Sequence, residues 1–428
     1  MDCHIEIFYE NQWRDAARVS FSDTVRDGFR GQDCVFEYEL DYAFDDSPPV
    51  SLRFPVNATR QRRRSWPAFM YDLVPQGNGR RFLLNQLGLS DVQASDLPLL
   101  CAGAFNSIGR LRIREAVDYF ERHVERHPHA TAEGFELDDL LARAPDFHET
   151  MMVHGMLAAG GTGVQGVAPK YLLTCAGDGK WHPDAALPDD RARAHYIVKR
   201  PRGTSAADRK VLQNEARYMA VARAMGIRSF DAPQLHGDLL FVPRFDRRVE
   251  AGRVMRFHQE SVASIAELPG FGQQADQFKL LAALRQVVDD PVGETIEFLC
   301  RDVLNLALRN PDNHARNTAV HTADGVTRLT PLFDFAPMYL DQEGITRAAR
   351  WYHPVSRKEL HDWADVLPHL ALPGPELEQV VEALVGFGDR MATLRDLLRA
   401  AQVDADIVAF VVPHIDAQRT QLTALRSA

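Results

Sequence analysis

The chain has 428 residues, of which 45% are hydrophobic and 25% charged, and this is enough for two or more packed cores. A formal net charge of -10 argues against a protein that coats nucleic acid through a general basic surface. The five cysteines are scattered and form no C-x-x-C pair, which favours reduced thiols over a disulfide framework. We find no signal peptide and no apolar run long enough for a membrane span, and therefore expect a cytoplasmic protein.

The N-terminal part predicts a β-rich unit. Apolar and polar residues alternate around Ile5–Tyr9 and Val35–Leu40, and Val50–Phe54 adds a further expected strand. Residues 69–89 carry apolar side chains at helical spacing, and Gly88 is suited to end such a helix.

Two polar segments of this part carry less information. Arg60–Arg64 (RQRRR) predicts a solvated surface loop, with contact to nucleic acid, an acidic partner or a substrate as the alternative. Residues 121–134 predict a linker. The alternative there is a metal site at His123, His127 and His129.

Downstream, strands and loops surround one clear helix at about Ala207–Met225, which Gly226 is placed to end. The remainder is mostly helical in pattern, as in residues 278–288, 295–308 and 403–425. We therefore expect an α+β protein whose C-terminal half is mainly helical.

Four landmarks follow one another along the chain. They are Gly161–Gly166 (GTGVQG), Lys199 at the end of an apolar stretch, Asp312–Asn317 (DNHARN) and Asp334–Ala336 (DFA). A glycine-rich loop, a strand lysine, an Asp five positions before an Asn and a later Asp-Phe pair form the ATP-handling order of a protein kinase. Each landmark is weak alone, and the ordered set indicates phosphoryl transfer.

The first two landmarks suit phosphate binding. Glycines let backbone amides approach phosphate oxygens closely, although a plain β-turn is the alternative. A lysine on a buried strand needs anionic partners, because an ammonium is costly to desolvate. By analogy with the kinase lysine–glutamate pair, Glu215 on the following helix is the expected carboxylate partner of Lys199, and an edge of solvated charge is the alternative.

The later landmarks suit metal binding and catalysis. In a kinase catalytic loop, the residue at the position of Asp312 accepts the proton of the substrate hydroxyl, and the one at Asn317 binds magnesium. Asp334 follows 22 residues after Asp312, behind an apolar stretch, where a carboxylate can hold magnesium against phosphates. The alternatives are a turn at Asp312 and a helix N-cap at Asp334.

An apolar strand at residues 239–245 lies where a kinase hinge would bind adenine, and an ordinary core strand is the alternative. With these residues in place, the chain resembles the HipA-type serine/threonine kinases, the toxin half of bacterial type II toxin–antitoxin pairs. The resemblance covers most of the chain and is carried by Phe69–Gly77, Gly163–Gln165 with Pro169-Lys170, Asn214-Glu215, Arg244–Arg247, Gln259-Glu260, Asp312–Asn317 and Leu329–Asp334.

The resemblance implies a two-lobed protein-kinase-like α+β fold. It implies a β-rich N-terminal subdomain in residues 1–128, a kinase N-lobe in 129–245 and a helical C-lobe in 246–428. It implies Asp312 as the catalytic base and Asn317 and Asp334 as magnesium ligands. The residues expected to bind ATP are Gly163, Val164, Gln165, Lys199, Glu215, Pro243 and Phe245.

The resemblance also implies partners. Known substrates of the family include aminoacyl-tRNA synthetases, and its usual partner is a small helix-turn-helix antitoxin that represses the operon. Two departures concern regulation. The family loop carries a serine that is autophosphorylated to switch the kinase off, whereas this chain has Gly160, Gly161 and Thr162 there, so Thr162 is the candidate autophosphorylation site. Gly166–Ala168 is inserted before Pro169.

Three functions remain, in order of preference. The first is an ATP- and magnesium-dependent serine/threonine kinase that phosphorylates a cellular protein to arrest growth. The second is a kinase-like nucleotide-binding module that acts as the partner of a DNA-binding antitoxin. The third is a metal-dependent nuclease built on the cluster at Asp312–Asn317, against which the overall acidity counts.

Overall fold

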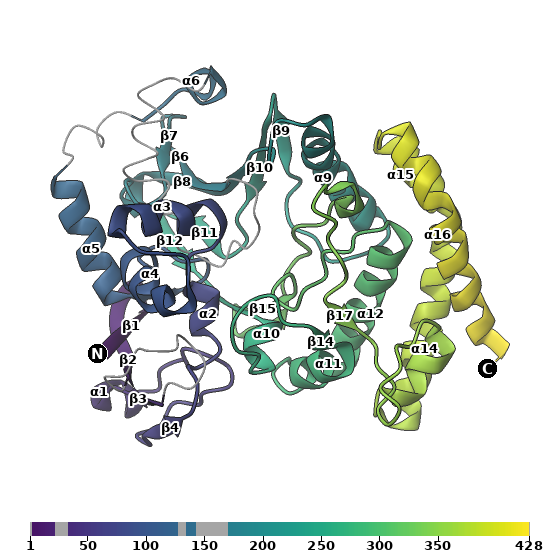
Figure 1. Cartoon of the computed structure of the whole chain (residues 1–428), viewed down its shortest axis with the longest axis horizontal. Helices are drawn as coiled ribbons and strands as arrows, with labels where there is room; N and C mark the ends of the chain where they lie inside the picture. Colours follow the sequence, from purple (N-terminus) through teal and green to yellow (C-terminus); the bar gives the residue numbers. More distant parts are fainter. Residues whose placement is uncertain (1, 22–32, 127–133, 143–169, 428) are drawn as a thin grey trace. The chain divides into compact units, whose positions relative to one another are not determined.

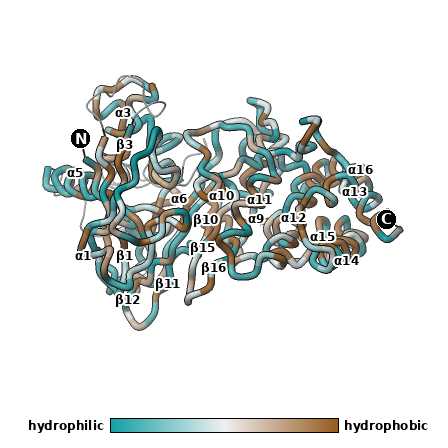
Figure 2. The backbone as a smooth tube through the Cα atoms, turned by 90° about the horizontal axis from the view of Figure 1, so that it is seen from below, coloured by the Kyte–Doolittle hydropathy of each residue, from teal (hydrophilic) through white to brown (hydrophobic). Residues whose placement is uncertain are grey.

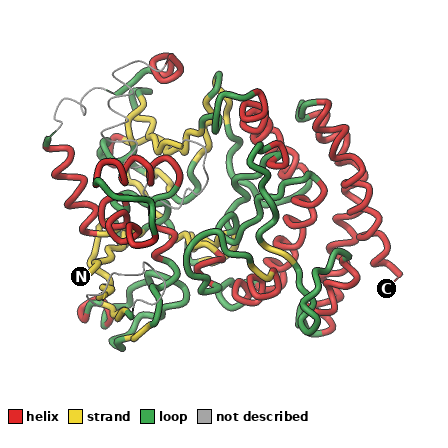
Figure 3. The backbone as a smooth tube through the Cα atoms, viewed as in Figure 1, coloured by secondary structure: helices red, strands yellow, loops and turns green. Residues whose placement is uncertain are grey.

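The computed structural model describes residues 2–21, 33–126, 134–142 and 170–427. The chain divides into two compact units. Unit 1 comprises Met1–Arg202, His236–Glu260 and Glu267–Phe271, and unit 2 comprises Gly203–Leu235, Ser261–Ala266 and Gly272–Ala428. Figure 3 shows that strands are concentrated in unit 1 and helices in unit 2. No helix in the described ranges combines the length and the apolar character needed to cross a membrane.

Unit 1 begins with a five-stranded antiparallel sheet in the order β4-β3-β2-β1-β5 (Figure 1). Alternate residues such as Ile5, Ile7 and Phe36 are fully buried in one hydrophobic core, as period-two patterning predicts. The strands are β1 (Asp2–Tyr9), β2 (Gln12–Phe21), β3 (Cys34–Tyr38), β4 (Gln61–Arg63) and β5 (Leu111–Ile113).

Short helices complete this part of unit 1. They are α1 (Leu40–Ala43), α2 (Met70–Leu73), α3 (Gly77–Leu87), α4 (Asp96–Gly103), α5 (Arg114–Glu125) and α6 (Leu137–Ala142). The single helix expected over residues 69–89 is therefore two helices, because Pro75 interrupts the backbone hydrogen bonding between them. Gly88 does end α3, in a left-handed conformation with φ of 66°.

Three further expectations for this part need correction. Val50–Phe54 forms no strand of the sheet, and only an isolated bridge joins Ser51 to Phe54. The basic segment expected as a loop contains strand β4, whose Arg63 pairs with Glu267. The expected linker begins inside α5, which extends to Glu125, and residues 127–133 lie outside the described ranges.

The second sheet has five strands in the order β7 (Trp181–Pro183), β6 (Lys170–Ala176), β8 (Ala192–Lys199), β10 (Leu239–Pro243) and β9 (Gln234–His236). The β7–β6, β6–β8 and β8–β10 pairs are antiparallel. The expected strand that ends at Lys199 is confirmed as β8. The strand expected at 239–245 is confirmed as β10, which ends earlier, at Pro243. A hairpin of β11 (Arg247–Glu250) and β12 (Arg253–Arg256) follows, although the sequence pattern after Phe245 favoured helices.

Unit 2 is mainly helical, and Figure 2 shows its apolar residues gathered along the helices. The expected helices at 207–225, 278–288, 295–308 and 403–425 are confirmed, with small shifts at their ends. They are α9 (Ala206–Ala224), α11 (Gln277–Arg285), α12 (Pro291–Ala307) and α16 (Ala405–Ala424). The others are α10 (Val262–Ile265), α13 (Trp363–Val366), α14 (Gly374–Arg390) and α15 (Leu394–Ala400), with strands β14 (Ala275–Asp276), β15 (Ala319–Ala323), β16 (Val326–Leu329) and β17 (Ala349–Arg350).

Local sequence explains where the main helices of unit 2 start. Ser205 and Asp208 form a reciprocal capping box at α9, which satisfies backbone amides that have no partner inside the helix. Asp290 caps α12, whose first residue is Pro291, a residue well suited to that position.

Candidate active site

The loop that carries Asp312 follows directly from α12. Asn310 is 3% exposed, and its side chain bonds to the Asn305 side chain at 2.9 Å, while their backbones also pair at 2.9 Å. The Asn310 side chain then accepts the backbone amide of Asp312 at 3.3 Å. A chain of amides therefore fixes the start of the loop to the last turns of the helix.

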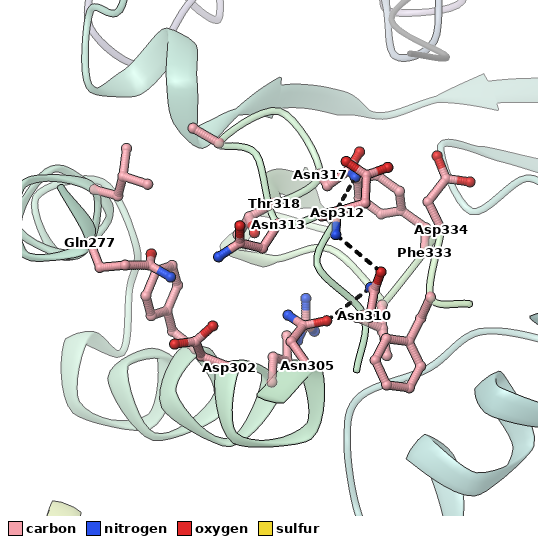
Figure 4. A pocket seen from close by; sticks show the side chains of 16 residues that line it. Gln277, Asp302, Asn305, Asn310, Asp312, Asn313, Asn317, Thr318, Phe333 and Asp334 are labelled. Atoms are coloured by element: carbon pink, nitrogen blue, oxygen red, sulfur yellow. Dashed lines mark hydrogen bonds between the residues drawn. The ribbon is translucent and has the colours of Figure 1, made fainter. Parts of the chain in front are cut away.

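Within the loop, Asn317 closes back on Asp312. Its side-chain nitrogen donates to the Asp312 carbonyl at 2.9 Å (Figure 4). Its backbone amide donates to the His314 carbonyl at 2.8 Å. The His314 ring nitrogen lies 3.5 Å from a carboxylate oxygen of Asp312. Because the amide nitrogen of Asn317 is used internally, its amide oxygen is the atom suited to a cation.

The second carboxylate, Asp334, follows β16 and has a left-handed backbone with φ of 52°. A non-glycine residue in this conformation carries strain of about 1–2 kcal/mol, and such residues concentrate at functional sites. No helix begins at Asp334, so the N-cap alternative is not seen in the described structure around it.

A partly buried ion pair and a buried arginine hold the segment that leads to Asp334. Arg228 binds both carboxylate oxygens of Glu294 on α12, at 2.8 and 2.7 Å, and also donates to the Leu329 carbonyl at 3.0 Å. Arg301, which is 6% exposed, donates to the Thr330 carbonyl at 2.8 Å. The strand that precedes Asp334 is thereby tied to α12, the helix that also precedes Asp312.

Asp312, Asn317 and Asp334 line one small pocket of about 40 Å³ in unit 2. Figure 4 shows the three side chains on the same side of this pocket, with Asn310 and Asn305 beneath them. The structure therefore brings together the predicted catalytic base and the two predicted metal ligands. The oxygens suit Mg²⁺, which takes few protein carboxylates and leaves the remaining positions to phosphates and water.

The pocket is connected to α9. Tyr218 of α9 is fully buried, donates to the Leu308 carbonyl at 3.2 Å and contacts the ring of Phe335 at 5.5 Å between centroids. Phe335 directly follows Asp334. The helix that carries Glu215 therefore contacts both the end of α12 and the segment of the second carboxylate.

Asn313 holds a segment that sequence reasoning did not single out. Its amide oxygen accepts the backbone amides of Ala348 and Ala349, at 3.1 and 3.3 Å, and its amide nitrogen donates to the Ala349 carbonyl at 2.7 Å. Buried Asp302 accepts from Arg347 at 2.6 Å and from the Trp351 indole at 2.9 Å. The chain after Asp334 is thus bound to the pocket wall.

In unit 1, Lys199 is 5% exposed at the end of β8, and Lys170 of β6 lies directly opposite it. Lys170 is itself 8% exposed. Two like charges opposite each other on adjacent strands are unfavourable unless anionic groups lie close to them. Lys170 was not predicted as a site residue, although it belongs to the motif that carried the family resemblance.

Glu215 is 6% exposed on α9, in unit 2, whereas Lys199 belongs to unit 1. Their pairing stays a prediction. Gly163, Val164, Gln165 and the candidate autophosphorylation site Thr162 lie outside the described residues.

The predicted hinge residues Pro243 and Phe245 are half-buried on either side of Arg244. Pro243 is the last residue of β10 and pairs with Tyr196 of β8. Proline has no amide hydrogen, so the backbone of Pro243 can offer adenine its carbonyl oxygen as an acceptor but no donor. Adenine recognition stays a prediction for both residues.

A sealed charge network anchors this segment. Arg244 donates to Asp246 at 2.9 and 2.6 Å and to Asp184 at 3.0 Å, and Asp246 also accepts the Gly109 amide at 2.7 Å. Arg247 lies 3.2 Å from Asp184. Burial alone would raise the pKa of Asp184, but the charges of Arg247 and Arg244, together with the hydrogen bond from His195, outweigh burial and hold this pKa well below its ordinary value.

Comparison with known proteins identifies the chain. A family model described as the HipA-like C-terminal domain matches residues 162–389. The chain belongs to the HipA family. A HipA N-terminal domain model also matches residues 25–114. A search of curated protein sequences gives no significant match.

Among solved structures, this HipA-family chain is similar to a chain of the Shewanella oneidensis MR-1 toxin–antitoxin complex of HipA, HipB and operator DNA. The TM-score is 0.62 at 16% identity, over 99% of this chain and 96% of that one. The Helicobacter pylori proinflammatory kinase CtkA matches with a TM-score of only 0.38 at 14% identity, over 55% of this chain and 90% of that one. The predicted family and the kinase-like α+β fold are confirmed.

Proposed function

We propose that this HipA-family protein is an ATP- and magnesium-dependent serine/threonine protein kinase that modifies a cellular protein to arrest growth. Asp312 accepts the proton of the substrate hydroxyl, and Asn317 and Asp334 bind magnesium. When bound, the metal neutralises charge on the phosphates during transfer. Lys199 and Lys170 hold the phosphates, and Glu215 orients Lys199.

One observation carries this proposal. Asp312, Asn317 and the strained Asp334 line a single small pocket, although Asp334 comes 22 residues after Asp312. Phosphoryl transfer by a kinase needs a base, an amide and a second carboxylate in one place. The catalysis itself consists almost entirely of positioning the reactants and stabilising charge.

The decisive experiment is transfer of radiolabelled γ-phosphate from ATP–Mg²⁺ by the full chain, alone and in a cell lysate, with labelled sites mapped by mass spectrometry. Label on a lysate protein supports the proposal and names the target, and we expect an aminoacyl-tRNA synthetase among the candidates. Label at Thr162 supports self-inactivation at that residue. A protein that binds no ATP–Mg²⁺ and labels nothing contradicts the proposal.

The Shewanella HipA structure contains HipB and operator DNA. We propose by analogy that this chain has a helix-turn-helix antitoxin partner and reaches operator DNA through it. Nucleotide binding without transfer, together with antitoxin binding, would favour the alternative of a kinase-like binding module. Co-purification with the product of a neighbouring gene tests the partner directly.

A further inference from the structure

Helix α9 carries the proposed lysine partner Glu215, contacts Phe335 through Tyr218, and also contacts the turn between α15 and α16. Its turns advance by about 100° per residue, so Asn214 and Glu215 project in clearly different directions. Glu215 is the proposed partner of the phosphate-binding lysine. Tyr218 contacts Phe335 beside the metal ligand Asp334. The face formed by Lys210, Asn214 and Arg217 has no part in the proposed chemistry.

That third face binds the turn between α15 and α16. A carboxylate oxygen of Asp404 accepts a hydrogen bond from Arg217 at 2.6 Å. Its other oxygen lies 3.5 Å from the Lys210 ammonium, which lies closer to Asp406 of α16, at 2.5 Å. The Asn214 side chain accepts the backbone amide of Asp404 at 3.2 Å. Asn214 is fully buried, and its amide nitrogen donates to the Lys210 carbonyl at 2.8 Å.

The role of Asp404 is unusual for its position. Asp404 is the N-cap residue of α16, where an aspartate normally accepts backbone amides from the first turn of its own helix. Here its side chain makes no capping hydrogen bond to α16. Its carboxylate is directed to α9 instead.

The turn that presents Asp404 is tightly built. Gln402 has a left-handed backbone with φ of 58°, and the Val403 amide bonds back to the Leu398 carbonyl at 3.0 Å. These contacts resemble the glycine-containing ends of helices, but a glutamine occupies the strained position. α15 also packs against α9, and α16 packs along α12, the helix that leads to Asp312 (Figure 1).

We propose that Asp404 is a positioning residue that clamps α9 through Arg217, Lys210 and Asn214. The clamp, which rests on the proposed kinase function for its catalytic consequence, holds Glu215 and Tyr218 in the orientation that phosphoryl transfer needs. The C-terminal pair α15–α16 therefore sets the activity of a site to which it contributes no catalytic group. Without the clamp, nucleotide binding has to restore the order of α9.

The test uses Asp404→Ser in the full chain. Serine is as good an N-cap residue as aspartate, so α16 keeps its capping potential while Arg217 of α9 loses its carboxylate partner. The ion pair of Lys210 with Asp406 and the bond from the backbone amide of residue 404 to Asn214 remain. Asp416→Ser is the matched control, because Asp416 lies on the same helix and pairs with Arg395 of α15 at 3.6 Å. Hydrogen exchange of peptides from α9, α12 and α16 is measured with and without ATP–Mg²⁺.

In Asp404→Ser, we expect the first three turns of α9 to exchange at least about fivefold faster without nucleotide, and ATP–Mg²⁺ to restore most of the protection. The dissociation constant for ATP should rise about five- to tenfold, because binding then has to order the helix. α12 and α16 should exchange as in the wild type. Asp416→Ser should match the wild type in every respect.

A charge-reversal pair tests whether the effect comes from the ion pair itself rather than from a general loss of folding. Arg217→Asp alone should loosen α9, and adding Asp404→Arg should restore its protection and the ATP affinity, since the ion pair is rebuilt with reversed charge. Unchanged exchange of α9 in Asp404→Ser overturns the clamp. Hydrogen exchange measured without nucleotide does not depend on ATP binding. It therefore tests the contact between Asp404 and α9 even if the protein proves not to be a kinase.

Discussion

In unit 1 the charged network is sealed from water, and the side chains of Asp184 and Arg244 are both 0% exposed. In unit 2 the carboxylate of Asp312 remains 23% exposed, and the neighbouring residue Asp334 has a strained backbone instead. Two aspartates and two arginines neutralise each other in unit 1, whereas Asp312 and Asp334 face a pocket. The contrast separates charges that are sealed inside a folded unit from carboxylates that line a pocket.

The largest expected effect on activity comes from replacing Asp312 in the pocket. We expect Asp312→Asn to lower phosphoryl transfer by about 10²–10⁴-fold, the usual range for losing a general base. Stability should change little, within about 0.5 kcal/mol, because this carboxylate is partly solvated. Label transfer and urea unfolding are measured side by side, with Asp365→Asn at an exposed position as the control. A large loss of stability in Asp312→Asn would contradict the distinction drawn between the two units.

The opposite result is expected at Asp184. Asp184→Asn removes one charge of a fully buried network and leaves Asp246 as the carboxylate that Arg244 and Arg247 still share. Removing one member of a buried ion pair typically costs about 3–5 kcal/mol. Urea unfolding of the full chain should report this loss. A cost below about 1 kcal/mol would mean that the network contributes no more than a surface ion pair does.

Features with local sequence signals could be predicted before the structure was known. The strand at Tyr196–Lys199 and the helix at 207–225 were predictable, because their periodicity and end signals are local. Asp312, Asn317 and Asp334 could be proposed from spacing alone, and the structure then placed them around one pocket.

Long-range contacts were out of reach. Nothing local in the sequence marks Lys170 as the cross-strand neighbour of Lys199, since that depends on the register of β6 and β8. Val50–Phe54 looked like a strand because periodicity cannot tell a packed turn from a paired strand. The role of Asp404 depends on contacts with residues 187 positions away, at Arg217.

The stability of the buried network in unit 1 should also depend on pH. Burial lowers the pKa of His195, so the folded protein keeps this ring neutral while an unfolded chain would protonate it below a pH of about 6.5. The unfolded state then binds more protons, and stability falls as the pH drops from 6.5 toward the lowered pKa, by up to about 1.4 kcal/mol per pH unit. Above pH 6.5 this contribution is constant.

Unfolding in urea at several pH values checks this expectation. His195→Asn keeps a donor toward Asp184, which His195 contacts at 2.5 Å, but it cannot titrate. We therefore expect a flatter pH dependence in the variant between pH 5 and 6.5. Parallel curves for variant and wild type would assign the acid sensitivity to other groups, such as His258, whose pKa burial also lowers.

The smallest expected effect lies at Gln402, the strained residue before Asp404. Glycine adopts a φ of 58° without steric cost, so Gln402→Gly should relieve about 1–2 kcal/mol of strain in the folded state. The added freedom of the unfolded chain offsets about 0.4–1 kcal/mol of that gain, and we expect a net stabilisation of roughly 0.5–1 kcal/mol. Gln379→Gly, at an exposed position inside α14, should instead destabilise by about 1 kcal/mol, because glycine there gains nothing in the folded state. If both glycine variants are destabilised equally in urea, the turn before α16 carries no strain. If only Gln402→Gly is stabilised while ATP affinity is unchanged, the contacts of Asp404 rather than the strain in the turn are what hold α9.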